Sequence, residues 1–202
     1  MTKIKFCGLS RRCDIEAANE LKVEYIGFVF ALKSKRYITL SKAEELKRLL
    51  DADIQAVGVF VNEEPEVVAD LLERGIIDIA QLHGDEDETY IAQLRQLTDK
   101  KIIKAFRIKA ADDIAAAERS SADYILLDSG AGTGEVFDWT LLHHISRPYF
   151  LAGGLSPDNA GQASAVLRPY AVDVSSGIET DGRKDKTKMT AFAAAVRKEE
   201  RL

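Results

Sequence analysis

The sequence predicts an α/β fold, a single (β/α)8 barrel with short loops that spans residues 1–202 as one domain. Short apolar runs alternate with helical patterns along the whole chain, and this alternation occurs eight times at a spacing of about 25 residues. Runs such as "YIGFVF" and "YILLD" are apolar without strict alternation, as expected for parallel strands covered on both faces. A length of 202 residues leaves such a barrel almost no insertions. An open doubly wound sheet is the alternative, but such sheets usually have fewer strands.

The predicted strands are the short apolar runs of this alternating pattern. In chain order they are Lys3–Cys7, Tyr25–Phe30, Gln55–Phe60, Ile77–Gln81, Lys101–Phe106, Tyr124–Asp128, Tyr149–Ala152 and Ala171–Val174. Because each is followed by a helical segment, consecutive strands are expected to run parallel.

Helical patterns fill the intervals between the strands, as in "RRCDIEAANELK", "SKAEELKRLL", "EPEVVADLLERG" and "DEDETYIAQLRQL". Ser41 followed by Glu44 has the spacing of a capping box, and Pro65 falls in the first turn of its helix, where a missing N–H is harmless. Gly75 stands where a glycine commonly terminates a helix. Asp138 is predicted to cap the helix after the sixth strand.

Composition and charge exclude several classes of protein. The net charge of −5 argues against binding to nucleic acid, whose phosphate backbone requires a basic surface. No apolar run is long enough to span a bilayer, and no signal peptide precedes the first strand. Cys7 and Cys13 are the only cysteines, which favours a reducing compartment over a disulfide framework. We therefore expect a cytoplasmic protein without nucleic-acid or membrane partners.

The functional residues are expected at the C-terminal ends of the strands, where the active sites of such barrels lie. Cys7 ends the first strand and Asp128 ends the sixth, while Arg36 follows the second and Gln81 and His83 end the fourth. The cysteine is compatible with packing, metal binding, nucleophilic attack or proton transfer.

Glycine-rich loops follow the seventh strand in "LAGGLSPDN" and the eighth strand in "VDVSSGIE". Backbone without side chains exposes N–H groups, and a helical turn beginning near Gly177 would direct its dipole at an anion. Tight turns alone would explain either loop, but the two loops together predict a phosphate site. The residues expected to bind the phosphate are Gly153, Gly154, Ser175, Ser176 and Gly177. Glu179 must then point away from it.

Metal and dinucleotide sites are not predicted. Cys7 and His83 lack further ligands at the usual spacing, and the adjacent His143 and His144 would face different directions on a helix. The "GAGTG" run after the sixth strand departs from the dinucleotide fingerprint, and we interpret it as a flexible loop over the site. Trp139 is interpreted as a helix-packing residue.

Six stretches, in this order, resemble the signatures of the phosphoribosylanthranilate isomerase family: "IKFCGLS", "IGFVFALKSKRYI", "QLHG", "LLDSGAGTGEVFDW", "FLAGGLSPDN" and "AVDVSSGIE". The resemblance extends from residue 3 to about residue 188. It implies an Amadori rearrangement in tryptophan biosynthesis, in which N-(5-phosphoribosyl)anthranilate becomes 1-(2-carboxyphenylamino)-1-deoxyribulose 5-phosphate. It also implies a small phosphoribosyl substrate, no metal or other cofactor, and a monomer or homodimer.

By this resemblance Cys7 is the general base and Asp128 the general acid, and Arg36, Gln81 and His83 bind the substrate. Arg36 is placed to pair with the anthranilate carboxylate. The chemistry requires a partly ionised thiol, and hence a positive local potential, together with a carboxyl group that retains its proton. The chain departs from the family at Glu135 and Val136, where lysine and threonine are usual, and at Phe6, where isoleucine is common.

Three alternatives remain from the sequence alone. One is a ring-closing indoleglycerol phosphate synthase, which normally needs a catalytic lysine at a strand end and an N-terminal extension. Another is a ribulose-phosphate epimerase, which expects metal-binding histidines and acids. The third is a barrel that binds a phosphosugar without catalysis, which the presence of both Cys7 and Asp128 disfavours.

Overall fold

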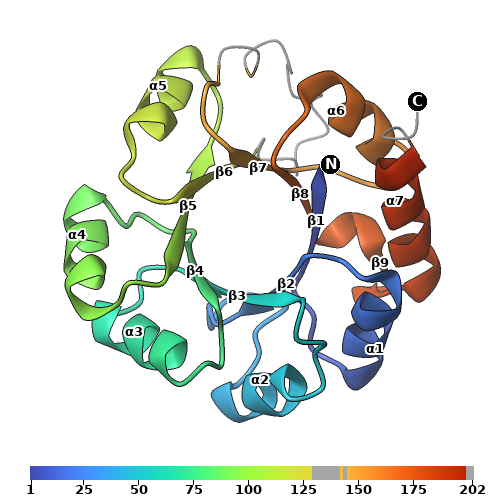
Figure 1. Cartoon of the computed structure of the whole chain (residues 1–202), viewed down its shortest axis with the longest axis horizontal. Coiled ribbons are helices and arrows are strands. Elements are labelled where there is room, and N and C mark those ends of the chain that lie inside the picture. The colour runs from blue at the N-terminus through green and yellow to red at the C-terminus, as the bar shows by residue number, and fades with distance from the viewer. Residues whose placement is uncertain (129–141, 143–144, 199–202) are drawn as a thin grey trace.

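Eight parallel strands close into a barrel in the computed structural model, which describes residues 1–128, 142 and 145–198 (Figure 1). The strands pair in chain order, and the ring closes between β1 and β8. Their bounds are β1 Lys3–Cys7, β2 Tyr25–Val29, β3 Gln55–Phe60, β4 Ile79–Leu82, β5 Lys101–Arg107, β6 Tyr124–Asp128, β7 Tyr149–Ala152 and β8 Ala171–Val174. The predicted barrel and its strand order are confirmed, with β4 starting two residues later than expected.

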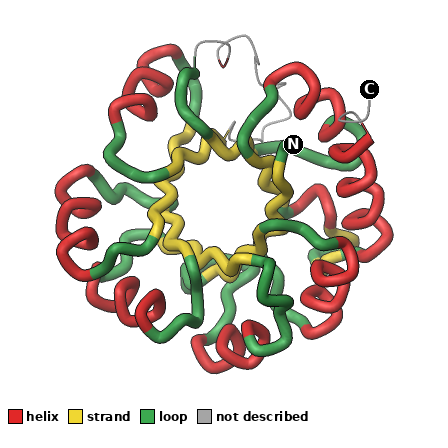
Figure 2. The backbone as a smooth tube through the Cα atoms, in the orientation of Figure 1, coloured by secondary structure: helices red, strands yellow, loops and turns green. Residues whose placement is uncertain are grey.

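The helices lie outside this ring and cover the outer face of the strands (Figure 2). They are α1 Arg12–Leu21, α2 Leu40–Lys47, α3 Pro65–Glu73, α4 Glu88–Leu97, α5 Ala111–Arg119, α6 Ala160–Leu167 and α7 Lys186–Lys198. A 3-10 turn, η2 (Ser176–Ile178), and a small hairpin of β9 (Glu179–Thr180) and β10 (Arg183–Lys184) follow β8.

Two of the predicted helix-end signals are confirmed and one is wrong. Pro65 is the first residue of α3, and Gly75 follows its end with a φ of 68°, in the left-handed region that glycine adopts most readily. The predicted capping box at Ser41 is wrong, because α2 already begins at Leu40. Thr39 caps it instead, with its side-chain oxygen accepting a hydrogen bond of 3.3 Å from the Lys42 amide.

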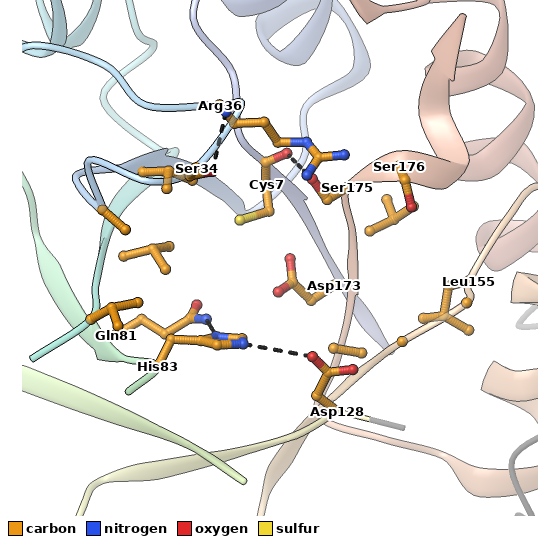
Figure 3. Close-up of a pocket in the computed structure, with 18 residues that line it drawn as sticks. Cys7, Ser34, Arg36, Gln81, His83, Asp128, Leu155, Asp173, Ser175 and Ser176 are labelled. Carbon is orange, nitrogen blue, oxygen red and sulfur yellow. Dashed lines mark hydrogen bonds and ion pairs between the residues drawn. The ribbon is translucent and has the colours of Figure 1, made fainter. Parts of the chain in front are cut away.

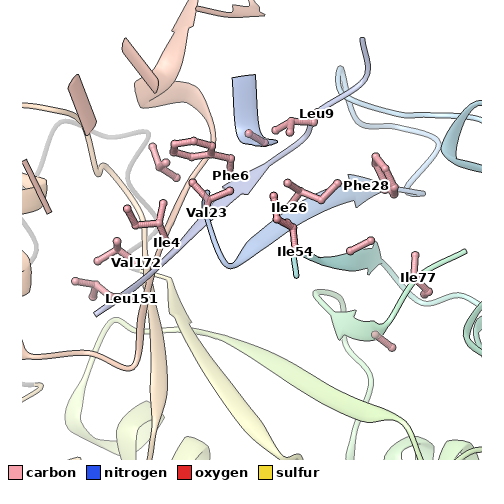
Figure 4. Close-up of a cluster of buried hydrophobic side chains, with 14 of the residues drawn as sticks. Ile4, Phe6, Leu9, Val23, Ile26, Phe28, Ile54, Ile77, Leu151 and Val172 are labelled. Atoms are coloured by element: carbon pink, nitrogen blue, oxygen red, sulfur yellow. The ribbon is translucent and has the colours of Figure 1, made fainter. Parts of the chain in front are cut away.

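Side chains alternate along each strand between the helix layer and the barrel interior. On β1, Ile4 and Phe6 join the core shared with the helices, and Figure 4 draws them with their register partners, Val172 of β8 and Ile26 of β2. The Phe6 ring meets Phe192 of α7 edge-on, with centroids 6.1 Å apart, so this aromatic side chain packs against α7. Lys5 and Cys7 alternate with these residues and therefore face the interior.

Aromatic residues close the end of the barrel where the strands begin. Tyr25, Phe150 and Tyr170 lie there, with the Tyr25 and Phe150 rings 5.3 Å apart and the Tyr25 and Tyr170 hydroxyls 2.9 Å apart. A layer of Val57, Ile79, Ile103 and Leu126 continues this filling toward the middle. Side chains therefore fill the barrel at the N-terminal ends of the strands, and a site can open only at their C-terminal ends. No helix among the described residues combines the length and apolar character needed to cross a bilayer.

Candidate active site

A pocket of about 320 Å³ opens at the C-terminal ends of the strands (Figure 3). Strand ends and loops from both halves of the barrel contribute to it. Of the residues predicted from the sequence, it is lined by Cys7, Arg36, Gln81, His83, Asp128, Gly153, Gly154, Ser175 and Ser176. Among the described residues, no group of three or more His, Cys, Asp or Glu side chains could hold a metal ion.

Cys7 and Asp128 line this pocket from opposite sides. Figure 3 shows the two side chains on opposite sides, with Asp173 between them in that view. Cys7 ends β1 and is 8 % exposed, while the Asp128 side chain at the end of β6 is 25 % exposed. A ligand in the pocket would therefore have the thiol on one side and the carboxyl on the other.

The thiol of Cys7 is closely packed and has charged groups of both signs around it. On the neighbouring strand, a Cβ atom at Gly27 would lie only 2.7 Å from the sulfur, so glycine there makes room for it. Burial raises the pKa of Cys7, the Lys5 ammonium opposes this, Asp173 raises the pKa further, and Lys184 lowers it. The two ammonium groups favour the thiolate, but the balance leaves the pKa of Cys7 raised, opposite to the direction that the expected chemistry requires.

A hydrogen-bonded pair from β4 and the residue after it faces Asp128. Gln81 is 1 % exposed, and its Nε2 lies 2.9 Å from Nδ1 of His83, whose Nε2 is 3.6 Å from Oδ2 of Asp128. With the amide donating to Nδ1, a neutral imidazole carries its proton on Nε2, toward Asp128. Oε1 of Gln81 is buried and has no hydrogen-bond partner among the described residues.

Arg36 is held by Glu179, the first residue of β9. Its Nε donates to Oε1 of Glu179 at 2.6 Å, and its Nη2 donates to Oε2 at 2.8 Å. Lys184, with a 2 % exposed side chain, also donates to Glu179, at 2.6 Å. Burial raises the pKa of Glu179, but the hydrogen bonds from Arg36 and Lys184 outweigh it and lower the pKa to about 2. Glu179 thus points at these cations and is not among the lining residues, as the sequence argument required.

The two glycine-rich loops lie side by side at one edge of the pocket. Gly153 and Gly154 have φ angles of 92° and 61°, which favour glycine, and they line the pocket together with Ser175 and Ser176. Gly177 is not among the lining residues. A Cβ atom there would lie 1.9 Å from the backbone oxygen of Leu155, so this glycine lets the two loops approach each other. The expected helical turn is the short 3-10 turn η2.

Apolar side chains form the wall on the side of β2 and β3. Val29 and Val59 are buried around Cys7, with Ala31 packed against them, and Val61 extends the wall toward the rim. The pocket is therefore apolar on one side and lined by glycine and serine backbone on another, with charged groups between them.

Sequence reasoning missed three charged residues around Cys7. Lys5 is fully buried, and its Nζ donates to both carboxylate oxygens of Asp173 at 2.9 Å. Lys184 donates to the backbone oxygen of Ser175 at 2.9 Å, and the Ser175 hydroxyl donates to the Cys7 carbonyl oxygen at 3.0 Å. A usable signal existed: "KIKFC" and "AVDV" each place a charge inside an otherwise apolar strand, at a position that faces the interior.

Several sequence predictions concern residues outside the described part of the chain. These are the "GAGTG" loop, the departures from the family in that loop, the predicted cap and packing residue after it, and the adjacent histidines, namely residues 130–134, Glu135, Val136, Asp138, Trp139, His143 and His144.

Comparison with known proteins gives one consistent result. The family model described as N-(5′-phosphoribosyl)anthranilate (PRA) isomerase matches residues 4–195. The N-(5′-phosphoribosyl)anthranilate isomerase of Endomicrobium trichonymphae is 46 % identical over 202 residues, covering 98 % of this chain and 99 % of that protein. That of Clostridium acetobutylicum is 46 % identical over 207 residues, with the same coverage.

Solved structures agree with the sequence comparisons. The crystal structure of phosphoribosyl anthranilate isomerase from Thermotoga maritima is similar, with a TM-score of 0.91 and 35 % identity, covering 98 % of this chain and all of that one. A phosphoribosyl anthranilate isomerase in complex with reduced 1-(o-carboxyphenylamino)-1-deoxyribulose 5-phosphate has a TM-score of 0.88 at 35 % identity and the same coverage.

Proposed function

The chain belongs to the N-(5′-phosphoribosyl)anthranilate isomerase family, and from that premise we propose that its pocket performs the rearrangement with Cys7 as general base and Asp128 as general acid. The chain is thus an isomerase of tryptophan biosynthesis, and the synthase and epimerase alternatives are set aside. The observation that carries the assignment of the two residues is that Cys7 and Asp128 face each other across one pocket.

The reaction needs an acid and a base on opposite sides of the ribose. Asp128 protonates the ring oxygen, the C1′–O bond breaks, and the lone pair of the anthranilate nitrogen forms a C1′=N iminium. The Cys7 thiolate then removes the proton from C2′, and the electron pair of that C–H bond becomes a C1′=C2′ double bond, which neutralises the iminium. The resulting enolamine becomes the ketone when the proton of the 2′-hydroxyl is lost and a proton is added at C1′. The substrate neither gains nor loses atoms overall.

The two ends of the substrate fit different sides of the pocket. The phosphate is assigned to the loops after β7 and β8, where Gly153, Gly154, Ser175 and Ser176 bring backbone close to a ligand. Gly177 supports this site by letting the loops meet, which modifies the direct contact predicted from the sequence.

The anthranilate ring is assigned to the apolar wall of Val29 and Val59, and its carboxylate to Arg36. Within the described residues, the pair with Glu179 occupies Nε and one N–H of Nη2, so the N–H groups of Nη1 are left for a ligand. The unpartnered Oε1 of Gln81 suits a ribose hydroxyl, because a buried acceptor gains from a donor. The chemistry assigned to these residues needs no metal or other cofactor.

An assay by anthranilate fluorescence tests this proposal. Substrate formed in situ is fluorescent and loses its signal on rearrangement, so turnover is read as a decay. The parent protein and Cys13→Ala, which changes an exposed free thiol, should both turn over, and Cys7→Ala should not. Failure of the parent protein to consume the substrate, or to rescue a tryptophan auxotroph that lacks this step, would overturn the proposal.

The assembly and compartment follow from the same proposal. A phosphoribosylanthranilate isomerase of Thermotoga maritima is described as dimeric. For this chain we propose one catalytic domain that works as a monomer or homodimer, which light scattering after size exclusion measures directly. A base that must remain a free thiol favours the reducing cytoplasm.

A further inference from the structure

Lys5 is a buried ammonium whose presence the packing of the barrel does not explain. Its side chain is 0 % exposed, and its Nζ donates to both oxygens of Asp173 at 2.9 Å. The two residues are register partners on β1 and β8. Removing an ammonium and a carboxylate from water is costly, and an apolar pair of similar volume often stabilises a protein as well or better. The pair therefore calls for a functional reason.

The position of Lys5 relative to Cys7 supplies that reason. The two residues are separated by one position on β1, so both side chains face the interior, with Cys7 nearer the mouth. Beneath them, Tyr25, Val57 and Phe150 fill the barrel with apolar groups. An ammonium enclosed in this way acts on the neighbouring sulfur through a medium of low dielectric constant, where charge interactions are strong.

We propose that Lys5 is a positioning residue for the catalytic thiol, and that its ammonium, anchored by Asp173, stabilises the thiolate of Cys7 that removes the C2′ proton. The proposal rests on the role of Cys7 proposed above. Asp173 holds the ammonium in place, but it also faces the sulfur from the pocket wall and opposes ionisation. Lys5 and Asp173 therefore act on the ionisation of Cys7 in opposite directions, and their sum sets how readily the thiol loses its proton.

Other charged groups around Cys7 are less effective partners. Lys184 on β10 and Arg36 after β2 are both paired with Glu179, as Lys5 is with Asp173, but the effect of Lys184 on the pKa of Cys7 is smaller than that of Lys5, and Arg36 is partly exposed whereas Lys5 is fully enclosed. Burial raises the pKa of Cys7, and Lys5 is the largest influence in the opposite direction, through its charge. The pKa of Lys5 is itself raised: burial lowers it, but Asp173 and Cys7 outweigh the burial, so the ammonium stays charged at neutral pH.

The ionisation of Cys7 can be measured without substrate. In a Cys13→Ser background, which removes the exposed thiol, the rate of alkylation by iodoacetamide against pH gives the pKa of Cys7 directly. Lys5→Met should raise this pKa by about 1 unit or more, and lower kcat/KM near pH 7 by about tenfold or more. Asp173→Asn should lower it, because an opposing negative charge is lost. The pH dependence of kcat/KM should shift in the same directions.

A double variant separates catalysis from folding. Lys5→Met with Asp173→Leu removes both buried charges, so the protein should unfold at or above the parental temperature. Because the two charges act on Cys7 in opposite directions, this double variant is compared with Asp173→Asn, which keeps the ammonium, and it should have the higher Cys7 pKa and the lower kcat/KM of the two. Lys104→Met is the matched control, because Lys104 is also a buried lysine paired with a carboxylate, Glu86 at 3.0 Å. It should change thermal stability and leave the alkylation profile of Cys7 unmoved.

A folded double variant whose alkylation profile and pH dependence match those of Asp173→Asn would overturn the proposal. If Lys5→Met alone fails to fold, the double variant and Asp173→Asn still decide. The proposed function fails separately: normal turnover by Cys7→Ala would remove the base role, whatever Lys5 does to the thiol.

Discussion

Glu179 binds Arg36 side-on, with both carboxylate oxygens facing Nε and Nη2 at 2.6 and 2.8 Å. The guanidinium beside the pocket is therefore already oriented, and its Nη1 group takes no part in this pair. Lys184 donates to the same carboxylate, at Oε1, over 2.6 Å. Glu179, a carboxylate close to an expected anion site, thus supports the residue assigned to the substrate carboxylate.

Arg36→Met should mainly raise KM for the phosphoribosyl substrate, by about tenfold or more, because it removes a contact distant from the reacting atoms. Arg36→Lys should recover only part of this loss, since an ammonium cannot form the two-point pair. Steady-state kinetics of the three proteins measure the effect. An unchanged KM in Arg36→Met would remove Arg36 from substrate binding.

Glu179→Gln tests whether Glu179 orients Arg36 for substrate binding. The amide keeps the shape of the side chain but loses the charge that pairs with Arg36 and Lys184. KM should rise by a smaller factor than in Arg36→Met, on the order of threefold, with kcat nearly unchanged. The double variant with Arg36→Met should be no worse than Arg36→Met alone, because both changes affect one interaction. Additive losses would contradict this coupling.

The same carboxylate predicts a dependence of stability on pH. The folded-state pKa of Glu179 is lowered to about 2 from an ordinary value of 4.5. A group with a depressed folded pKa contributes stability that is present above its unfolded pKa and lost as the pH falls toward the folded one. Urea unfolding between pH 5 and about pH 2 should therefore show a steeper acid loss for the parent than for Glu179→Gln. Parallel curves would show that Glu179 contributes nothing in this range.

Cys7→Ala and Asp128→Ala should each lower kcat by orders of magnitude while KM changes little, because each group acts mainly in the transition state. Asp128→Asn provides a shape-matched comparison, since the amide fills the same space but cannot supply the acidic proton. Its kcat should be as low as that of Asp128→Ala. Near-normal turnover in a variant would remove that residue from its role.

The strands, and the residues at their ends, were accessible from the sequence because they depend on local order. Cys7 and Asp128 end short apolar runs, and parallel topology brings such ends together. The Lys5–Asp173 pair was not accessible in this way, since its partners are 168 residues apart and only barrel closure brings them into register. A lysine in "KIKFC" signals that it needs a partner, but not which one.

Local signals also compete, which is why one helix boundary was wrong. Thr39 and Ser41 both carry hydroxyls suited to capping, and the spacing from Ser41 to Glu44 favoured the second. In the fold, the backbone is extended at Thr39 and helical from Leu40, so Thr39 becomes the cap. The positions of Gly153 and Gly177 show the same limit: both follow strands in glycine-rich loops, but only Gly153 lines the pocket.

Gly177→Ala should impair both stability and phosphate binding. The added methyl would meet the backbone oxygen of Leu155 at 1.9 Å, and backbone on both sides must move to relieve this contact. Because the two loops that meet there are those assigned to the phosphate, KM for the substrate should rise together with a loss of thermal stability.

Gly75→Ala is the matched control for Gly177→Ala: its φ of 68° is strained for alanine, but nothing lies within 4 Å of the new atom. It should cost about 1 kcal/mol of stability and leave KM unchanged. Equal effects of the two changes on KM would show that contact between the loops does not shape the phosphate site.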